Sequence, residues 1–190
     1  LHFFYSTMNA GKSTALLQSN HNYLESDLKT MLFIPEEIGT KSNGKIISRI
    51  GLKADAIVVN KNYCFYDEIE KTKYKEISCI FIDEAQFLSK KQVHNLGRIA
   101  DELNIPVMCY GIRTDFQGEL FEGSKELLAL ADNLKELKTI CSLCDKKATM
   151  VVRINQDGEV ILKGEKILIG GNEKYKTLCR KHFRELTKLI

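Results

Sequence analysis

Residues 6–14 read Ser-Thr-Met-Asn-Ala-Gly-Lys-Ser-Thr and have the types and spacing of a phosphate-binding loop. Gly11, Lys12 and Ser13 match the end of the pattern G-x-x-x-x-G-K-[ST]. In such a loop, backbone N–H groups hold phosphate oxygens, the lysine reaches the β and γ phosphates, and the hydroxyl ligates Mg²⁺. Ser6 stands at the position of the first glycine, so we expect it to adopt an ordinary negative φ. Because an apolar run precedes the loop and a helical pattern follows it, we favour a P-loop over a chance Gly-Lys-Ser.

A pair of carboxylates ends a second apolar run. Residues 79–82, Cys-Ile-Phe-Ile, are followed directly by Asp83 and Glu84. A buried strand of this kind brings an acid to Mg²⁺ at the carboxyl edge of a parallel sheet, and we predict that role for Asp83. Glu84 is predicted to accept a proton from an attacking hydroxyl or water, the alternative being a carboxylate that stabilises a helix N-terminus. Together the two motifs predict chemistry on a nucleoside triphosphate.

Three cysteines and one histidine form a metal-ligand pattern near the end of the chain. Cys141 and Cys144 make a C-x-x-C pair, Cys179 and His182 make a C-x-x-H pair, and 34 residues separate the pairs. Two such turns can complete a tetrahedral Zn²⁺ site with no open position, which is a structural site. The alternative is that Cys179 is a buried apolar residue and His182 lies on a helix surface. We predict structural zinc that pins both ends of the intervening segment.

Short apolar runs alternate with amphipathic ones up to about residue 131. We predict strands at residues 1–5, 30–34, 56–59, 79–82 and 107–110, which are rich in β-branched and aromatic residues. We predict helices at residues 13–23, 89–103 and 124–131, the last two opening with Ser89 and Ser124 as N-caps. This order predicts the α/β class, a parallel sheet covered by helices.

The pattern changes from about residue 139 onward. A weakly alternating run at residues 147–154, an Asp157-Gly158 turn signal and a second short run at residues 160–162 predict a small β-rich unit. The last residues, 180–190, predict a short amphipathic helix or a frayed end. We therefore expect two domains, residues 1–138 and 139–190, and we expect the polar residues 36–45 to form a mobile loop.

The composition excludes several classes of protein. The chain has 190 residues, with 28 Lys and Arg against 25 Asp and Glu, a net charge of +3, and 44% hydrophobic residues. This balance is too even for a chain built mainly to bind nucleic acid or an anionic membrane, so we expect neither partner. No apolar run approaches the roughly 20 residues that span a bilayer, and no leader pattern opens the chain. We expect a soluble, cytoplasmic protein.

Four stretches together resemble the type II thymidine kinases. They are Met-Asn-Ala-Gly-Lys-Ser at 8–13, Ile-Asp-Glu-Ala-Gln-Phe at 82–87, Tyr-Gly-Ile-Arg-Thr-Asp-Phe at 110–116, and Ile-Gly-Gly-Asn-Glu-Lys-Tyr at 169–175. The resemblance implies phosphoryl transfer from ATP to the 5′-hydroxyl of thymidine or deoxyuridine and a RecA-like P-loop core. It also implies a zinc-held lasso of about residues 164–176 over the nucleoside, feedback by thymidine triphosphate, and a homotetramer.

The resemblance also implies roles for individual residues. Glu84 is the expected general base, Lys12 binds the phosphates with the loop amides, and Ser13 and Asp83 hold Mg²⁺. The expected ATP and Mg²⁺ site comprises Ser6, Thr7, Met8, Asn9, Ala10, Gly11, Lys12, Ser13, Thr14, Asp83, Glu84, Ala85 and Gln86. The expected thymidine site comprises Met8, Phe87, Ile112, Phe116, Ile169, Gly170, Gly171 and Tyr175, with Phe116 against the base. For Phe116 and Tyr175 the alternative is ordinary packing.

The sequence offers two candidates for the positive charge that stabilises the transferring phosphoryl group. Family members often carry an Asp and an Arg after the second strand, where residues 35–41 read Pro-Glu-Glu-Ile-Gly-Thr-Lys. We assign the catalytic cation to Arg49, with Arg113 as the other candidate. The competing function is a RecA-like ATPase that acts on nucleic acid through a zinc knuckle, and a third is a non-catalytic nucleotide-binding scaffold.

Overall fold

A computed structural model describes residues 1–72, 74–165 and 173–189. Its main body is a six-stranded sheet in the order β5-β2-β6-β7-β1-β8, and all of its strand pairs are parallel. This confirms the predicted α/β class and all five predicted strands. The strands are β1 (His2–Ser6), β2 (Lys29–Pro35), β5 (Ile57–Val59), β6 (Ile77–Ile82), β7 (Val107–Ile112) and β8 (Asn133–Glu136).

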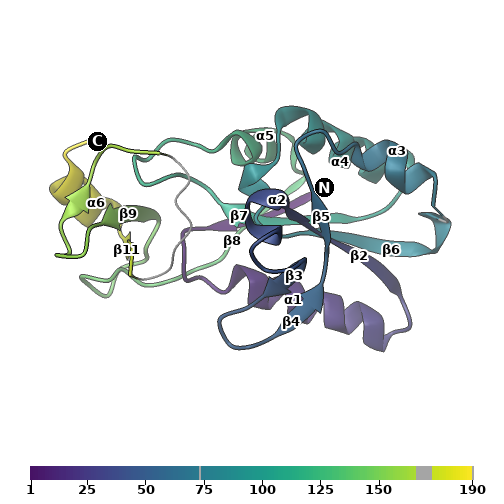
Figure 1. Cartoon of the computed structure of the whole chain (residues 1–190), viewed down its shortest axis with the longest axis horizontal. Coiled ribbons are helices and arrows are strands. Elements are labelled where there is room, and N and C mark those ends of the chain that lie inside the picture. The colour runs from purple at the N-terminus through teal and green to yellow at the C-terminus, as the bar shows by residue number, and fades with distance from the viewer. Residues whose placement is uncertain (73, 166–172, 190) are drawn as a thin grey trace.

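Side chains that alternate along the strands form two cores, one on each face of the sheet. Phe3, Phe33 and Ile80 point to one face and pack with apolar residues of α3 (Phe65–Glu70), α4 (Lys90–Glu102) and α5 (Glu122–Leu130). The neighbouring residues Leu32, Ile34, Cys79 and Phe81 pack on the other face with α1 (Lys12–Glu25). Figure 1 shows α3, α4 and α5 on one side of the sheet and α1 on the other. Burial on both faces explains why the sequences of β2, β6 and β7 are almost continuously apolar.

The helix starts agree with the sequence in two cases and differ in one. Helix α1 begins directly after Gly11, and α4 has the predicted Ser89 N-cap, with a capping box completed by Gln92. The predicted N-cap of α5 at Ser124 is wrong, because α5 begins at Glu122 with Phe121 as its N-cap. The Ser124 hydroxyl instead donates to the carbonyl of Ile112 at 2.6 Å. It thereby ties α5 to the end of β7.

Several short elements carry no strong sequence signal. Residues 36–45, expected to be a loop, contain the one-turn helix α2 (Glu36–Gly39) and the first residue of a hairpin. The hairpin joins β3 (Lys45–Ile47) and β4 (Lys53–Asp55), and its Ile46 is buried against α1. Two 3-10 turns, η1 (Tyr74–Glu76) and η2 (Ala85–Phe87), flank β6.

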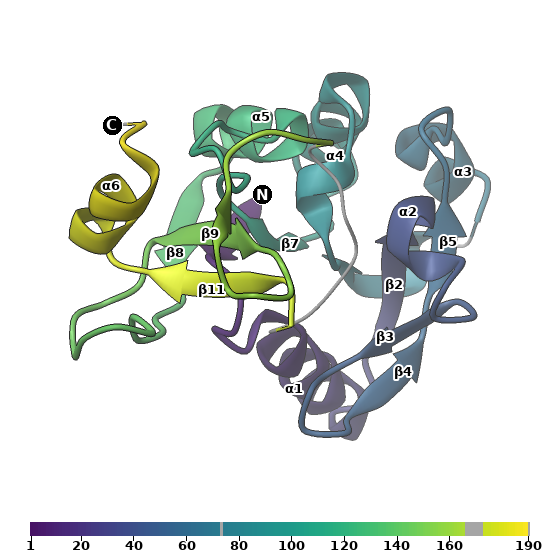
Figure 2. The ribbon, with the colours of Figure 1, turned by 60° about the vertical axis from the view of Figure 1, so that its left-hand side comes forward.

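A second, smaller sheet carries the end of the chain. It has the antiparallel order β10-β9-β11, from β9 (Met150–Ile154), β10 (Val160–Ile161) and β11 (Tyr175–Leu178). The predicted Asp157-Gly158 turn joins β9 to β10, with Gly158 at φ 82°. Helix α6 (Arg180–Thr187) follows and buries Phe183 against this sheet. Figures 1 and 2 show this unit at the opposite end of the molecule from α3.

One glycine fixes the distance between α5 and the turn that carries Glu84. A methyl group at Gly123 would lie 2.3 Å from the carbonyl oxygen of Ala85 and 2.9 Å from that of Leu88. Both neighbours are backbone atoms, so the clash cannot be relieved by a rotamer change. We therefore expect Gly123→Ala to lower the free energy of unfolding by about 3 kcal/mol or more.

Gly97 offers a matched control for that substitution. It lies inside α4 and has no atom within 4 Å of the added methyl group, so Gly97→Ala is expected to raise the free energy of unfolding by about 0.5–1 kcal/mol. Urea denaturation of both variants measures the difference. Equal stabilities of the two variants would show that α5 moves away from the turn at little cost.

Candidate active site

The loop between β1 and α1 has the backbone that phosphate binding needs. Asn9 and Gly11 adopt left-handed conformations, with φ of 63° and 73°, whereas Ser6 is the last residue of strand β1. The expectation of an ordinary φ at Ser6 is therefore confirmed. The two left-handed residues turn the chain sharply before α1, so the loop amides and the helix N-terminus face the same space.

Lys12 lies folded inside this loop. Its Nζ donates to the Thr7 carbonyl at 2.8 Å and to the Ser6 hydroxyl at 3.2 Å, and the side chain is buried. Burial lowers the pKa of Lys12, while the nearby charges of Glu84 and Asp83 oppose that shift. A buried cation beside a ring of backbone donors is the arrangement that holds a polyphosphate.

Asp83, at the end of β6, offers an oxygen for a cation. The Ser13 hydroxyl donates to its Oδ2 at 2.8 Å, and its Oδ1 is buried with no hydrogen-bond partner in the described part of the chain. Burial, together with the charge of Glu84, raises the pKa of Asp83 to about 7. A carboxylate and a hydroxyl that face each other, with one buried oxygen left over, fit the hard oxygen ligands that Mg²⁺ prefers.

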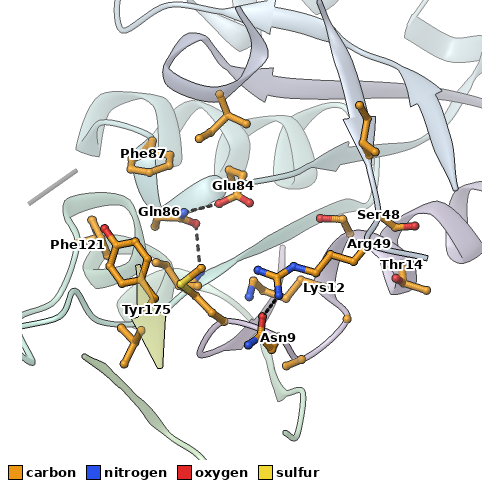
Figure 3. A pocket seen from close by; sticks show the side chains of 18 of the residues that line it. Asn9, Lys12, Thr14, Ser48, Arg49, Glu84, Gln86, Phe87, Phe121 and Tyr175 are labelled. Atoms are coloured by element: carbon orange, nitrogen blue, oxygen red, sulfur yellow. Dashed lines mark hydrogen bonds between the residues drawn. The ribbon is translucent and has the colours of Figure 1, made fainter. Parts of the chain in front are cut away.

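Glu84 is held in an uncommon conformation by its neighbours. Its backbone is left-handed, with φ 51°, at a cost of roughly 1 kcal/mol for a residue with a side chain. Gln86 Nε2 donates to Glu84 Oε2 at 2.5 Å, and Gln86 Oε1 accepts from the N–H of Ile112 at 3.1 Å (Figure 3). Since Gln86 must present its oxygen to Ile112, its amide nitrogen faces the Glu84 carboxylate. Strain of this kind at a half-buried carboxylate is typical of functional sites.

The P-loop and Glu84 line one cavity with a volume of about 540 Å³. Figure 3 shows Lys12, Glu84 and Arg49 around it, with Tyr175 on the side away from Arg49. Arg49, from the β3–β4 hairpin, contacts the Asn9 side chain of the loop. Arg113 does not line this cavity, and its guanidinium donates instead to the carbonyl of Thr149 at 3.3 Å. Of the two candidate cations, only Arg49 therefore faces the space beside the P-loop.

Aromatic side chains form the other end of the cavity. Phe87, Phe116, Phe121 and Tyr175 all line it, and the rings of Phe87 and Phe121 meet edge to face at 5.8 Å. Such walls bind flat, partly apolar groups, and the polar end beside them binds charged ones. One cavity thus offers a cationic, amide-rich end and an aromatic end, with the Glu84 carboxylate on its wall.

Cys141, Cys144, Cys179 and His182 come together as the spacing predicts. Their ligand atoms all lie within 4.8 Å of one another, with Cys144 Sγ 3.9 Å from Cys179 Sγ and Cys141 Sγ 3.4 Å from His182 Nδ1. Ligands about 2.3 Å from a tetrahedral ion stand about 3.8 Å apart, so the cluster has the size and donor set of a zinc site. Burial opposes ionisation of Cys141, but hydrogen bonds from the Cys179 backbone and from His182 lower its pKa to about 6. A thiolate at neutral pH suits metal binding.

Comparison with known sequences places the chain in a family. A profile of the family described as thymidine kinase matches residues 1–183. The chain belongs to the thymidine kinase family. It is 53% identical over 189 residues to the thymidine kinase of Haemophilus influenzae, covering 97% of this chain and 96% of that one. It is 50% identical over 186 residues to the thymidine kinases of Salmonella choleraesuis and Rhodopirellula baltica, covering 97% of this chain and 90% and 88% of theirs.

One solved structure is similar to part of the chain. The Pif1 helicase from Candida albicans matches 73% of this chain and 36% of its own, with 14% identity and a TM-score of 0.45. That likeness is too weak to indicate a shared function. No helix in the described part of the chain is long and apolar enough to cross a membrane.

Most residues expected from the thymidine kinase resemblance line the cavity. Those on its wall are Met8, Asn9, Ala10, Gly11, Lys12, Ser13, Thr14, Arg49, Glu84, Gln86, Phe87, Ile112, Phe116 and Tyr175. Ser6, Thr7, Asp83 and Ala85 lie behind the wall, where Ser6 and Thr7 hold Lys12 and Ala85 is fully buried. The expected residues Ile169, Gly170 and Gly171 lie outside the described residues.

Seven residues on the cavity wall are not among the site residues that the sequence predicts. They are Ile38, Ile47, Ser48, Ile50, Asp115, Phe121 and Val151. Ser48 and Ile50 flank Arg49, and Asp115 precedes Phe116, so closeness to a predicted site residue was the available signal for these three. Phe121 had no such signal, because it reaches the cavity only through the placement of α5.

Proposed function

We propose that the protein is a thymidine kinase, which transfers the γ-phosphoryl group of ATP to the 5′-hydroxyl of thymidine and forms the 5′-monophosphate. The observation that carries this is the single cavity with a P-loop at one end, aromatic rings at the other and the Glu84 carboxylate on its wall. Membership of the thymidine kinase family supports the choice of nucleoside.

In the proposed reaction the chain positions two substrates and moves one proton. The loop amides and Lys12 hold the phosphates of ATP, and the base of thymidine lies against Phe116 and Tyr175. The Glu84 carboxylate, oriented by Gln86, accepts the proton of the 5′-hydroxyl as that oxygen attacks the γ-phosphorus. The bond between this phosphorus and the oxygen that bridges it to the β-phosphate breaks, and ADP leaves. Lys12 and Arg49 stabilise the negative charge on the transferring group.

Two metal sites complete the proposal. Ser13 and Asp83 would hold Mg²⁺, which supplies positive charge to the phosphates when bound. Cys141, Cys144, Cys179 and His182 would hold a closed, structural Zn²⁺. We also propose, from the family resemblance, use of deoxyuridine, inhibition by thymidine triphosphate, a homotetramer, and a cytoplasmic location.

We further propose that the chain divides into domains near residue 138. The apolar cluster formed by the small sheet and α6 contains only residues from Cys141 onward, and the two clusters of the main sheet contain none of these. Hydrogen bonds cross the boundary between these cores: the Thr7 hydroxyl donates to the carbonyl of Met150 at 3.1 Å, and Gln117 Nε2 donates to that of Leu162 at 2.9 Å. Separate cores joined by hydrogen bonds are typical of two domains.

One assay separates the proposed kinase from a nucleic-acid-dependent ATPase. ADP release is measured with ATP alone, with thymidine, with deoxycytidine and with single-stranded DNA, and thymidine monophosphate is quantified in parallel. We expect thymidine to stimulate ADP release with one monophosphate formed per ADP, and DNA to have no effect. Stimulation by DNA without a phosphorylated nucleoside would favour the ATPase instead.

A further inference from the structure

We propose that Arg153 is a positioning residue of the nucleoside site, whose guanidinium holds the Phe116 ring, the Glu165 carbonyl and the Tyr175 side chain in one arrangement. The inference rests on the proposed function, because it takes the cavity wall formed by Phe116 and Tyr175 as the place where the nucleoside base lies. Arg153 lies in the weakly alternating run at residues 147–154 and is not among the site residues that the sequence predicts.

Arg153 occupies the centre of the small sheet. It lies on the middle strand β9, paired with Tyr175 of β11 on one side and with Ile161 of β10 on the other. Only 4% of its surface is exposed, which is unusual for an arginine and requires compensating contacts. The guanidinium therefore belongs to the interior of this unit and not to its solvent-facing surface.

A single nitrogen of Arg153 joins two distant points of the chain. Nη2 donates to the carbonyl of Glu165 at 2.7 Å and to the hydroxyl of Tyr175 at 3.1 Å. These partners lie 12 and 22 positions after Arg153 in the sequence. The two bonds fix Glu165 relative to Tyr175, and both residues belong to the stretch that the resemblance places over the nucleoside. Hydrogen bonds from a charged donor are stronger than neutral ones, particularly where water is excluded.

The same guanidinium stacks on the aromatic wall. Its Cζ lies 4.0 Å from the centroid of the Phe116 ring and 5.5 Å from that of Tyr175. Phe116 and Tyr175 line the cavity, whereas Arg153 does not. Arg153 therefore covers the Phe116 ring from behind and leaves another face or edge of the ring to the cavity. A cation over a ring face holds the ring by electrostatic attraction, and a planar guanidinium does so while keeping its in-plane N–H donors free for hydrogen bonds.

This combination of contacts predicts a role for arginine that lysine cannot fill. Lysine keeps the charge but has neither a flat face for Phe116 nor a planar set of donors that reaches two acceptors while it stacks. Because recognition through a loop depends on that loop being held still, loss of Arg153 should weaken nucleoside binding more than it slows the chemical step. ATP contacts lie at the other end of the cavity and should be unaffected.

The test compares Arg153→Met, Arg153→Lys and Tyr175→Phe with the wild type and with Arg184→Met, an exposed arginine of α6 in the same unit. We expect Arg153→Met and Arg153→Lys to raise KM for thymidine about 10- to 100-fold, with kcat and KM for ATP changed less than about 3-fold. Zinc content should stay at one ion per chain. Tyr175→Phe should have a smaller effect and should add little to Arg153→Met, since both remove the same hydrogen bond. Arg184→Met should resemble the wild type.

Hydrogen exchange separates this inference from the proposed function. We expect faster exchange at Glu165 and at residues 175–178 in Arg153→Met than in the wild type and Arg184→Met, whatever the substrate. An unchanged KM for thymidine together with unchanged hydrogen exchange would overturn the inference. A rise in KM for both thymidine and ATP together with loss of zinc would also overturn it, because that result indicates general unfolding of the unit. If the wild type fails to phosphorylate thymidine, both the proposed function and the nucleoside role of Arg153 are wrong. The hydrogen-exchange data would still decide whether Arg153 holds Glu165 and Tyr175.

Discussion

Glu84→Gln is expected to lower kcat for thymidine by about 10² to 10⁴, the usual range for loss of a general base, while ATP binding remains. Glutamine has the same shape and can still hydrogen-bond to Gln86, which now contacts Glu84 at 2.5 Å, but it cannot take up a proton. The left-handed backbone at residue 84 carries the same strain with either side chain. Steady-state kinetics, together with titration of ATP into the variant, measures the two quantities.

Two comparisons make the Glu84 result specific. Glu119→Gln removes an exposed carboxylate that does not line the cavity, so its kcat should match that of the wild type. The free energy of unfolding of Glu84→Gln should also lie within about 1 kcal/mol of the wild type, since no buried contact is lost. Near-normal phosphorylation of thymidine by Glu84→Gln would show that another group accepts the proton.

Loss of the zinc ligands is expected to weaken nucleoside binding strongly before it affects the P-loop core. Cys144→Ser, or removal of metal by a chelator, should raise KM for thymidine by about 10²-fold or more, because Tyr175 lies on β11, which leads directly into the ligand Cys179. A structural zinc contributes on the order of 10 kcal/mol to the folding of a small unit, far more than the apolar cluster beside it can replace. ATP affinity should change little, since every phosphate-binding residue precedes residue 85.

Thermal unfolding followed by circular dichroism provides the structural readout for the zinc variants. We expect the metal-free protein to lose the small sheet in a separate, earlier transition and to keep the main transition of the six-stranded sheet. Cys109→Ser is a suitable control because Cys109 is buried in the main core and lies outside the cluster, so this variant should keep its zinc. Unchanged thymidine affinity in a sample shown to lack metal would contradict a role for zinc in holding the nucleoside site.

The sequence by itself predicted the features that depend on short segments. The P-loop, the Asp83-Glu84 pair and the two Cys/His turns each place their groups through local backbone geometry, so residue types at fixed spacing are sufficient. The same holds for the apolar strands β2, β6 and β7, whose residues are mostly buried and therefore carry a nearly continuous apolar signal. The shorter elements escaped because their pattern is weak: β3 is Lys-Ile-Ile, β4 is Lys-Ala-Asp and β8 is Asn-Leu-Lys-Glu. Such strands form through pairing with partners far along the chain, which local propensity does not encode.

The sequence does not distinguish one arginine side chain from another, and only the tertiary structure decided which of them reach the site. Arg49 and Arg113 were both candidates from the sequence, and the β3–β4 hairpin brings Arg49 to the loop while Arg113 turns to Thr149. Arg153 looked like any charged residue of a half-polar strand until strand pairing and the position of Phe116 enclosed it. Long, flexible side chains such as arginine take their partners from whatever the packed elements bring within reach. Their roles therefore follow from the assembled fold, whereas the loop and turn motifs carry their geometry in the chain itself.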